Sequence, residues 1–154
     1  MFYIKQNFLN KSECDYFMSL VPRPNNDIRL KYAEDNSLWK HRTIDITNNH
    51  IVTKVSDHIY KVFGIRLEIE EAQIQNWIVG SESLPHTHKE WPQVKYNSLI
   101  YLNNDFEGGE FCTPNVTVKP KPGLLTLFDG SQTEHGLNKV LNNDRFTLIF
   151  WWKK

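Results

Sequence analysis

Short alternating runs of apolar and polar residues fill the chain from Arg66 to its end. The longest run covers residues 67–78, and the paired acids Glu70-Glu71 suggest a β-bulge there. Clusters of Asn, Asp, Gly and Pro separate this run from the shorter ones that follow. These lie at 96–103, 110–113, 116–119 and 124–128, in a segment that begins at His135, and at 145–152. Short strands at such close spacing favour a sandwich or barrel. A jelly roll fits well, because it lets side chains from several strands converge in a pocket between two sheets.

Helical patterns occur only in the first 64 residues. Asn10 and Glu13 form a capping-box pattern for a helix that ends near Leu20, and residues 49–63 show helical spacing before Gly64. Residues 22–40 are polar and proline-containing, which predicts a long loop. We therefore expect a mainly β fold with flanking helices and a jelly-roll, cupin-like core. Residues 1–154 would form a single domain, with 1–64 as a strand-helix-loop-helix support and 65–154 as the core.

Charge and cysteine content exclude several classes of protein. The 18 basic and 18 acidic residues balance to a formal net charge of +0, so nucleic acid is an unlikely partner. Two cysteines without a CxxC pair exclude a zinc ribbon and fit a reducing cytoplasm. The chain has neither a signal-peptide pattern nor an apolar run of the roughly 18 residues that a membrane span needs. We therefore expect a cytoplasmic protein.

Three histidines and one glutamate form the candidate metal site. His86 and His88 are two residues apart, Glu90 follows two further on, and His135 lies on a separate predicted strand. Residues i and i+2 of a strand share a face, so either His86 with His88 or His88 with Glu90 can reach one ion. Two such ligands and His135 would cover one face of an octahedral ion and leave the other open to substrates.

Arg145 is the candidate partner for an anion beside that metal. It follows His135 by ten residues, across the turn at 142–144, so on antiparallel neighbouring strands both side chains could point into one pocket. A guanidinium there can hold a carboxylate through two parallel charge-assisted hydrogen bonds.

Taken in order, these segments resemble the prolyl-4-hydroxylase-like branch of the Fe(II)/2-oxoglutarate-dependent dioxygenases. The resemblance spans nearly the whole chain and rests on the order and spacing of pieces that are each weak alone. They are the opening segment 7–14, the His-x-His stretch, Ser98-Leu-Ile-Tyr-Leu-Asn103, Glu107-Gly-Gly-Glu-Phe111, residues 118–123, the apolar strand to Phe128, His135, Arg145 and Trp151.

The resemblance implies a double-stranded β-helix core and a hydroxylase. His86 would be the first metal ligand and His135 the distal one, while Arg145 and Tyr101 would hold the remote carboxylate of 2-oxoglutarate. With Fe(II), O2 and 2-oxoglutarate, and ascorbate as reductant, such an enzyme hydroxylates a C–H bond and releases succinate and CO2. The substrate would be a small molecule or a peptide, with Lys89 and Trp91 as candidate contacts at the pocket mouth.

The chain departs from the family at the second ligand. The family motif is His-x-Asp, and His88 stands where the Asp is expected. His88 could ligate together with His86; His88 and Glu90 could ligate, with His86 outside the ligand set; or the second position could provide no ligand. We favour His86, His88 and His135, with Glu90 as the alternative second ligand. Two other functions follow from this change: a three-His oxygenase that does not use 2-oxoglutarate, and a jelly-roll binding module with an inactive site.

Overall fold

The computed structural model describes residues 1–21, 29–32 and 38–154, with only the backbone of 29–32 and 38–40. Two helices, α1 (Lys11–Ser19) and α2 (His50–Phe63), accompany the strands. Within the described residues, neither helix is long and apolar enough to cross a membrane. The strands are β1 (Phe2–Lys5), β2 (Arg29–Tyr32), β3 (Leu38–Asp45), β4 (Glu68–Trp77), β5 (Ser83–His86), β6 (Tyr96–Tyr101), β7 (Glu107–Gly108), β8 (Phe111–Cys112), β9 (Thr117–Val118), β10 (Leu125–Phe128), β11 (His135–Leu137), β12 (Val140–Leu141) and β13 (Arg145–Lys153).

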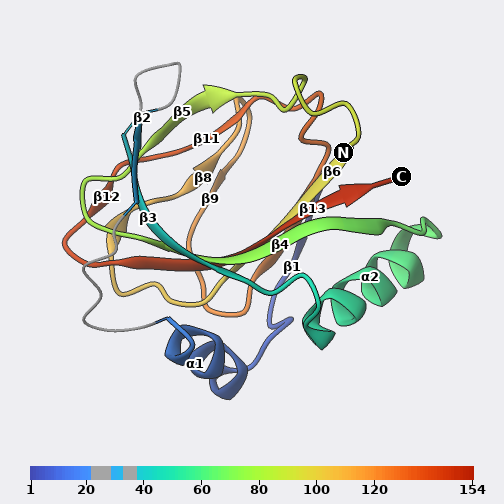
Figure 1. Cartoon of the computed structure of the whole chain (residues 1–154), viewed down its shortest axis with the longest axis horizontal. Helices are drawn as coiled ribbons and strands as arrows, with labels where there is room; N and C mark the ends of the chain where they lie inside the picture. The colour runs from blue at the N-terminus through green and yellow to red at the C-terminus, as the bar shows by residue number, and fades with distance from the viewer. Residues whose placement is uncertain (22–28, 33–37) are drawn as a thin grey trace.

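Two antiparallel sheets form the body of the molecule (Figure 1). The larger has seven strands in the order β1-β10-β6-β13-β4-β3-β2, and the smaller has four in the order β5-β11-β8-β9. A short pair, β12 with β7, forms a third sheet of two strands. Strands from the first 45 residues thus extend the large sheet at both edges, and they frame the jelly-roll strands predicted from the second half of the chain.

The main core lies between the helices and the outer face of the large sheet, and both helices cover that face (Figure 1). Side chains of β4 and β13 alternate, so every second residue of each strand joins this core. The predicted caps are present: Asn10 and Glu13 form the capping box of α1, and Gly64 ends α2 with φ +68°. The buried residues contributed by the helices are Cys14, Phe17, Ile51, Val55 and Ile59.

The expected loop at 22–40 is wrong in part. Residues 29–32 form β2, which pairs with the beginning of β3, so the short alternating segment Arg29-Leu-Lys-Tyr32 belongs to the sheet edge and not to a loop. Residues 22–28 and 33–37 of that loop lie outside the described residues. The expected bulge is confirmed: Trp151 pairs with Glu71 and Trp152 with Ile69, which leaves Glu70 as the extra residue.

Two glycines with positive φ provide a matched test of the packing. A Cβ at Gly123 (φ +82°) would lie 2.0 Å from the carbonyl oxygen of Leu9, whereas a Cβ at Gly64 would meet nothing within 4 Å. We expect Gly64→Ala to cost about 1–2 kcal/mol of unfolding free energy through left-handed strain alone. Gly123→Ala adds a backbone clash and should cost at least twice as much in urea unfolding. Equal losses would contradict this packing of residue 9 on the turn at 123.

Candidate metal centre

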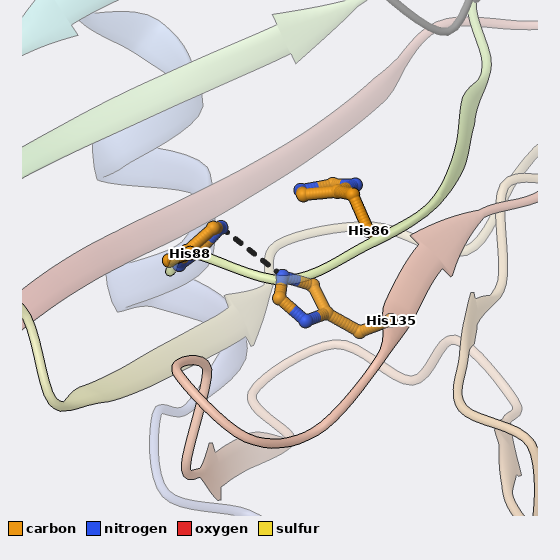
Figure 2. Close-up of side chains that lie close together, drawn as sticks. All are labelled: His86, His88 and His135. Carbon is orange, nitrogen blue, oxygen red and sulfur yellow. Dashed lines mark hydrogen bonds between the residues drawn. The ribbon is translucent and has the colours of Figure 1, made fainter. Parts of the chain in front are cut away.

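Three imidazoles converge where the small sheet meets the loop after β5 (Figure 2). His86 ends β5 and His135 begins β11, and the two are directly opposite each other in the antiparallel pair. The ring centroids of His86 and His88 each lie 4.6 Å from that of His135. One nitrogen from each ring lies within 4.8 Å of the others, which is close enough for one metal ion.

His88 reaches this cluster by a different route from the one we expected. The strand ends at His86, so the alternation of a strand does not bring His88 to the same side. Instead, the backbone N–H of His88 donates to the carbonyl of Gly130 at 2.9 Å, and this bond fixes the loop against the turn after β10. The i, i+2 spacing therefore indicated residues that do converge, but for an incomplete physical reason.

Each imidazole has an oxygen acceptor at its Nδ1 atom. His86 Nδ1 lies 2.9 Å from the carbonyl oxygen of Leu84, and His135 Nδ1 lies 2.7 Å from that of Thr133. His88 Nδ1 lies 3.0 Å from Oδ1 of Asn97. An oxygen of this kind can only accept, so the proton belongs on Nδ1 and the lone pair on Nε2. Such bonds orient imidazoles for metal binding.

The Nε2 atoms of His88 and His135 lie 3.2 Å apart. With metal–nitrogen bonds of about 2.1 Å, two imidazoles on one ion have nitrogens about 3.0–3.4 Å apart. Burial lowers the pKa of His88 to about 4 and that of His135 to about 3, so both rings are neutral at neutral pH. Two lone pairs therefore face each other with no proton between them, and a cation is the group that would stabilise this arrangement.

Glu90 does not join the cluster. Its side chain is exposed, and the group of potential ligands in the described residues consists of His86, His88 and His135. His58 lies elsewhere, 3.1 Å from the hydroxyl of Tyr3 on the helical side of the large sheet. The geometry thus favours the three-imidazole hypothesis over the one with Glu90.

Arg145 is buried to 2% exposure at the start of β13. Its Nε donates to the carbonyl of Gly109 at 2.8 Å, and its guanidinium lies 5.1 Å from the ring centroid of Tyr101. In the described part of the chain, no carboxylate oxygen lies within 4.0 Å of it. Burial lowers the pKa of Arg145 from its ordinary value, yet a guanidinium keeps its proton in proteins. This is a buried cation that an anionic ligand would stabilise.

The expectation that Arg145 and His135 lie on neighbouring strands is wrong. β13 belongs to the large sheet and β11 to the small one, because β12 intervenes and leads the chain from one sheet to the other. Contacts still connect the two residues. Tyr101, beneath the guanidinium, accepts a hydrogen bond from the backbone of Phe111 at 2.8 Å, and the ring of Phe111 stacks on His135 at 5.8 Å.

The predicted substrate contacts lie beside His88. Trp91 is exposed, and its ring centroid lies 6.0 Å from that of His88 and 6.3 Å from that of Trp151. Lys89 is exposed on the same loop. An aromatic pair next to the imidazoles forms an apolar rim, which is compatible with a substrate contact and stays a prediction.

Solved structures with the same arrangement identify the fold. An oxidoreductase of the 2OG-Fe(II) oxygenase family from Burkholderia pseudomallei superposes with a TM-score of 0.79 at 15% identity, over 99% of this chain and 84% of that one. The chain has the fold of the Fe(II)/2-oxoglutarate oxygenases. A viral collagen prolyl hydroxylase from Paramecium bursaria Chlorella virus-1, in a 2-oxoglutarate complex, has a TM-score of 0.74 at 16% identity, over 99% of this chain and 94% of that one. The double-stranded β-helix expected from the sequence is thereby confirmed.

Sequence comparison leads to the same group of enzymes. Prolyl 3-hydroxylase 2 of Rattus norvegicus is 35% identical over 65 residues, 37% of this chain and 9% of the relative. Prolyl 3-hydroxylase 1 of Rattus norvegicus is 30% identical over 115 residues, 60% of this chain and 16% of the relative. The chain thus matches less than a fifth of the length of these curated relatives. No protein-family model matches it.

Two residues beside the imidazole cluster were not predicted from the sequence. Asn97 is a fully buried amide in contact with His88, and Gly130 provides the carbonyl that accepts the backbone N–H of His88. Asn97 lies beside Ser98 at the start of a predicted strand that is apolar from Leu99 to Leu102, so its type gave only a weak signal. The carbonyls of Leu84 and Thr133 leave no trace in a sequence.

The lowered pKa values predict acid sensitivity of the metal-free protein. The unfolded chain binds protons at its histidines below about pH 6.5, whereas folded His88 does so only near pH 4. Unfolding therefore takes up protons in this window, and the free energy of unfolding should fall as the pH is lowered from about 6.5 to 4. With a chelator present, His88→Gln should show a shallower fall in urea titrations. Identical slopes in the two proteins would contradict a buried, neutral His88.

Proposed function

We propose that the protein is a non-haem Fe(II)/2-oxoglutarate-dependent dioxygenase that hydroxylates a C–H bond of its substrate. The observation that carries this proposal is the pairing of two features in one fold: three converging imidazole nitrogens, and a buried guanidinium without a carboxylate partner among the described residues. The first fits a metal, and the second fits a ligand with a free carboxylate. The resemblance to prolyl hydroxylases in fold and in sequence segments supports the same reaction class.

In this proposal, His86, His88 and His135 hold Fe(II) through Nε2. Arg145 binds the remote carboxylate of 2-oxoglutarate, with Tyr101 beside it. The bound iron, 2-oxoglutarate and O2 would supply the oxidation, with succinate and CO2 as coproducts. The protein's own contribution is orientation and exclusion of water: Phe111 and Phe128 pack on His135, at centroid distances of 5.8 and 4.8 Å.

A peptide or protein is the substrate class that the named relatives suggest. One solved neighbour is a prolyl hydroxylase from Trichoplax adhaerens in complex with a peptide fragment of hypoxia inducible factor, with a TM-score of 0.70 at 15% identity, over 99% of this chain and 83% of that one. Trp91 and Lys89 are the residues of this chain proposed to contact the substrate.

A reducing, cytoplasmic setting is compatible with Cys14 and Cys112, which are both free thiols.

The first test is anaerobic binding of Fe(II) followed by 2-oxoglutarate, monitored by visible absorption. We expect stoichiometric binding and then a weak charge-transfer band when the keto acid chelates the metal. His135→Ala should abolish both signals, because it removes a buried ligand. Glu90→Ala is the matched control and should leave both unchanged, since its side chain is exposed outside the cluster.

Cosubstrate turnover provides the second test. With Fe(II), ascorbate and O2, the wild-type protein should release succinate from 2-oxoglutarate, slowly without substrate and faster with the right one. Arg145→Gln should raise the KM for 2-oxoglutarate at least tenfold, because a carboxylate hydrogen-bonded to a charged group loses about 1.5–3 kcal/mol. Metal binding without any effect of 2-oxoglutarate would indicate a three-His oxygenase of another kind. Absence of metal binding would leave a jelly-roll binding module.

A further inference from the structure

Asn97 is a buried polar group to which the proposed chemistry assigns no role. It lies on β6 with no exposed surface, and its side chain faces the imidazole loop. Oδ1 accepts from His88 Nδ1 at 3.0 Å, and Nδ2 donates to the backbone carbonyl of Phe150 at 3.4 Å. The second bond fixes the orientation of the amide, because a flipped amide would point its oxygen at another oxygen. Asn97 therefore presents an acceptor to His88.

Gly130 provides the space for this contact. A Cβ at residue 130 would lie 2.0 Å from Oδ1 of Asn97 and 3.0 Å from Nδ1 of His88. The φ of Gly130 lies outside the left-handed region, so its backbone conformation by itself would permit a side chain. Its carbonyl also accepts the backbone N–H of His88 at 2.9 Å. A glycine is therefore needed here to leave space for the contact between His88 and Asn97, and not to allow the backbone conformation of the turn.

The acceptor decides which nitrogen of His88 is free. A neutral imidazole carries one proton, and the Oδ1 acceptor retains it on Nδ1. Nε2 then keeps its lone pair and faces Nε2 of His135 at 3.2 Å. Without Asn97, the proton could move to Nε2 and bond to His135, which would block both nitrogens. His86 and His135 obtain the same control from backbone carbonyls, whereas His88 depends on a side chain.

We propose that Asn97 and Gly130 are positioning residues that make His88 a metal ligand, by retaining its proton on Nδ1 and directing Nε2 to the other two imidazoles. This inference rests on the proposed function, since it concerns the same site. Neither Asn97 nor Gly130 would bind the metal, but both would be needed for His88 to bind it. Mutation of a residue that hydrogen-bonds to a metal ligand typically lowers metal affinity by about 10–100-fold.

The test has one reading that needs no metal. Long-range ¹H–¹⁵N NMR of the metal-free protein reports which ring nitrogen of His88 carries the proton. The wild type should show the Nδ1–H form. Asn97→Leu, which keeps the volume and loses the acceptor, should shift His88 toward the Nε2–H form. Asn97→Asp restores an acceptor and should return the ring to the Nδ1–H form.

Titration with Co(II), followed by its visible ligand-field spectrum, gives the second reading. We expect Asn97→Leu and Gly130→Ala to bind Co(II) at least tenfold more weakly than the wild type, and Asn97→Asp to bind within a few-fold of it. Asn76→Leu is the control for loss of a buried amide, because Asn76 is equally buried but bonds to Arg42 and Asp144. It should lose stability and keep the His88 proton and the Co(II) affinity unchanged.

The two readings separate failure of this inference from failure of the proposed function. If Asn97→Leu keeps both the Nδ1–H form and wild-type Co(II) affinity, Asn97 is a structural residue and the inference is wrong. A shifted proton with unchanged Co(II) affinity would also overturn it. If the wild type binds neither Co(II) nor Fe(II), the proposed function fails, and the assignment of Asn97 as positioning residue for a ligand fails with it.

Discussion

The mutual approach of three imidazole nitrogens is the constraint on which the rest of the site depends. Each ring has an oxygen acceptor at Nδ1, and the Nε2 atoms of His88 and His135 are 3.2 Å apart. Neutral rings with lone pairs at this distance repel one another, and burial opposes protonation that would relieve the repulsion. The fold holds them there through the β5–β11 pairing and the bond from His88 to Gly130. A bound cation would replace this repulsion between lone pairs with attractive bonds to the same nitrogens.

A cluster of three imidazoles, without a carboxylate among them, sets the charge of the site. Three neutral imidazoles leave both charges of a divalent ion uncompensated, and the buried guanidinium of Arg145 adds another positive charge within the same fold. A ligand with two carboxylates suits such a site better than a neutral one. Imidazole also suits zinc and copper, so competition between metals should be sharper here than at a site with a carboxylate ligand.

Local patterns in the sequence predicted most of the elements, and tertiary contacts explain the rest. The capping box at Asn10, the Gly64 end of α2 and the bulge at Glu70 are local signals, and all three were predicted from neighbouring residues. β2 was missed because its four alternating residues, Arg29-Leu-Lys-Tyr32, are too few to indicate a strand within a polar, proline-containing stretch, and its pairing with β3 is a tertiary contact. The three histidines were singled out by type and spacing, yet the loop that directs His88 depends on Gly130 and Asn97, from other strands and turns.

Anomalous diffraction at the iron absorption edge would locate a metal ion bound by the three imidazoles. Crystals of the protein would be soaked anaerobically with Fe(II) and 2-oxoglutarate. We expect one iron peak within bonding distance of Nε2 of His86, His88 and His135, and a keto acid whose far carboxylate contacts Arg145. An iron peak at Glu90, or iron bound with His88 turned away, would contradict the three-imidazole centre. A carboxylate bound away from Arg145 would contradict the assigned role of the buried guanidinium.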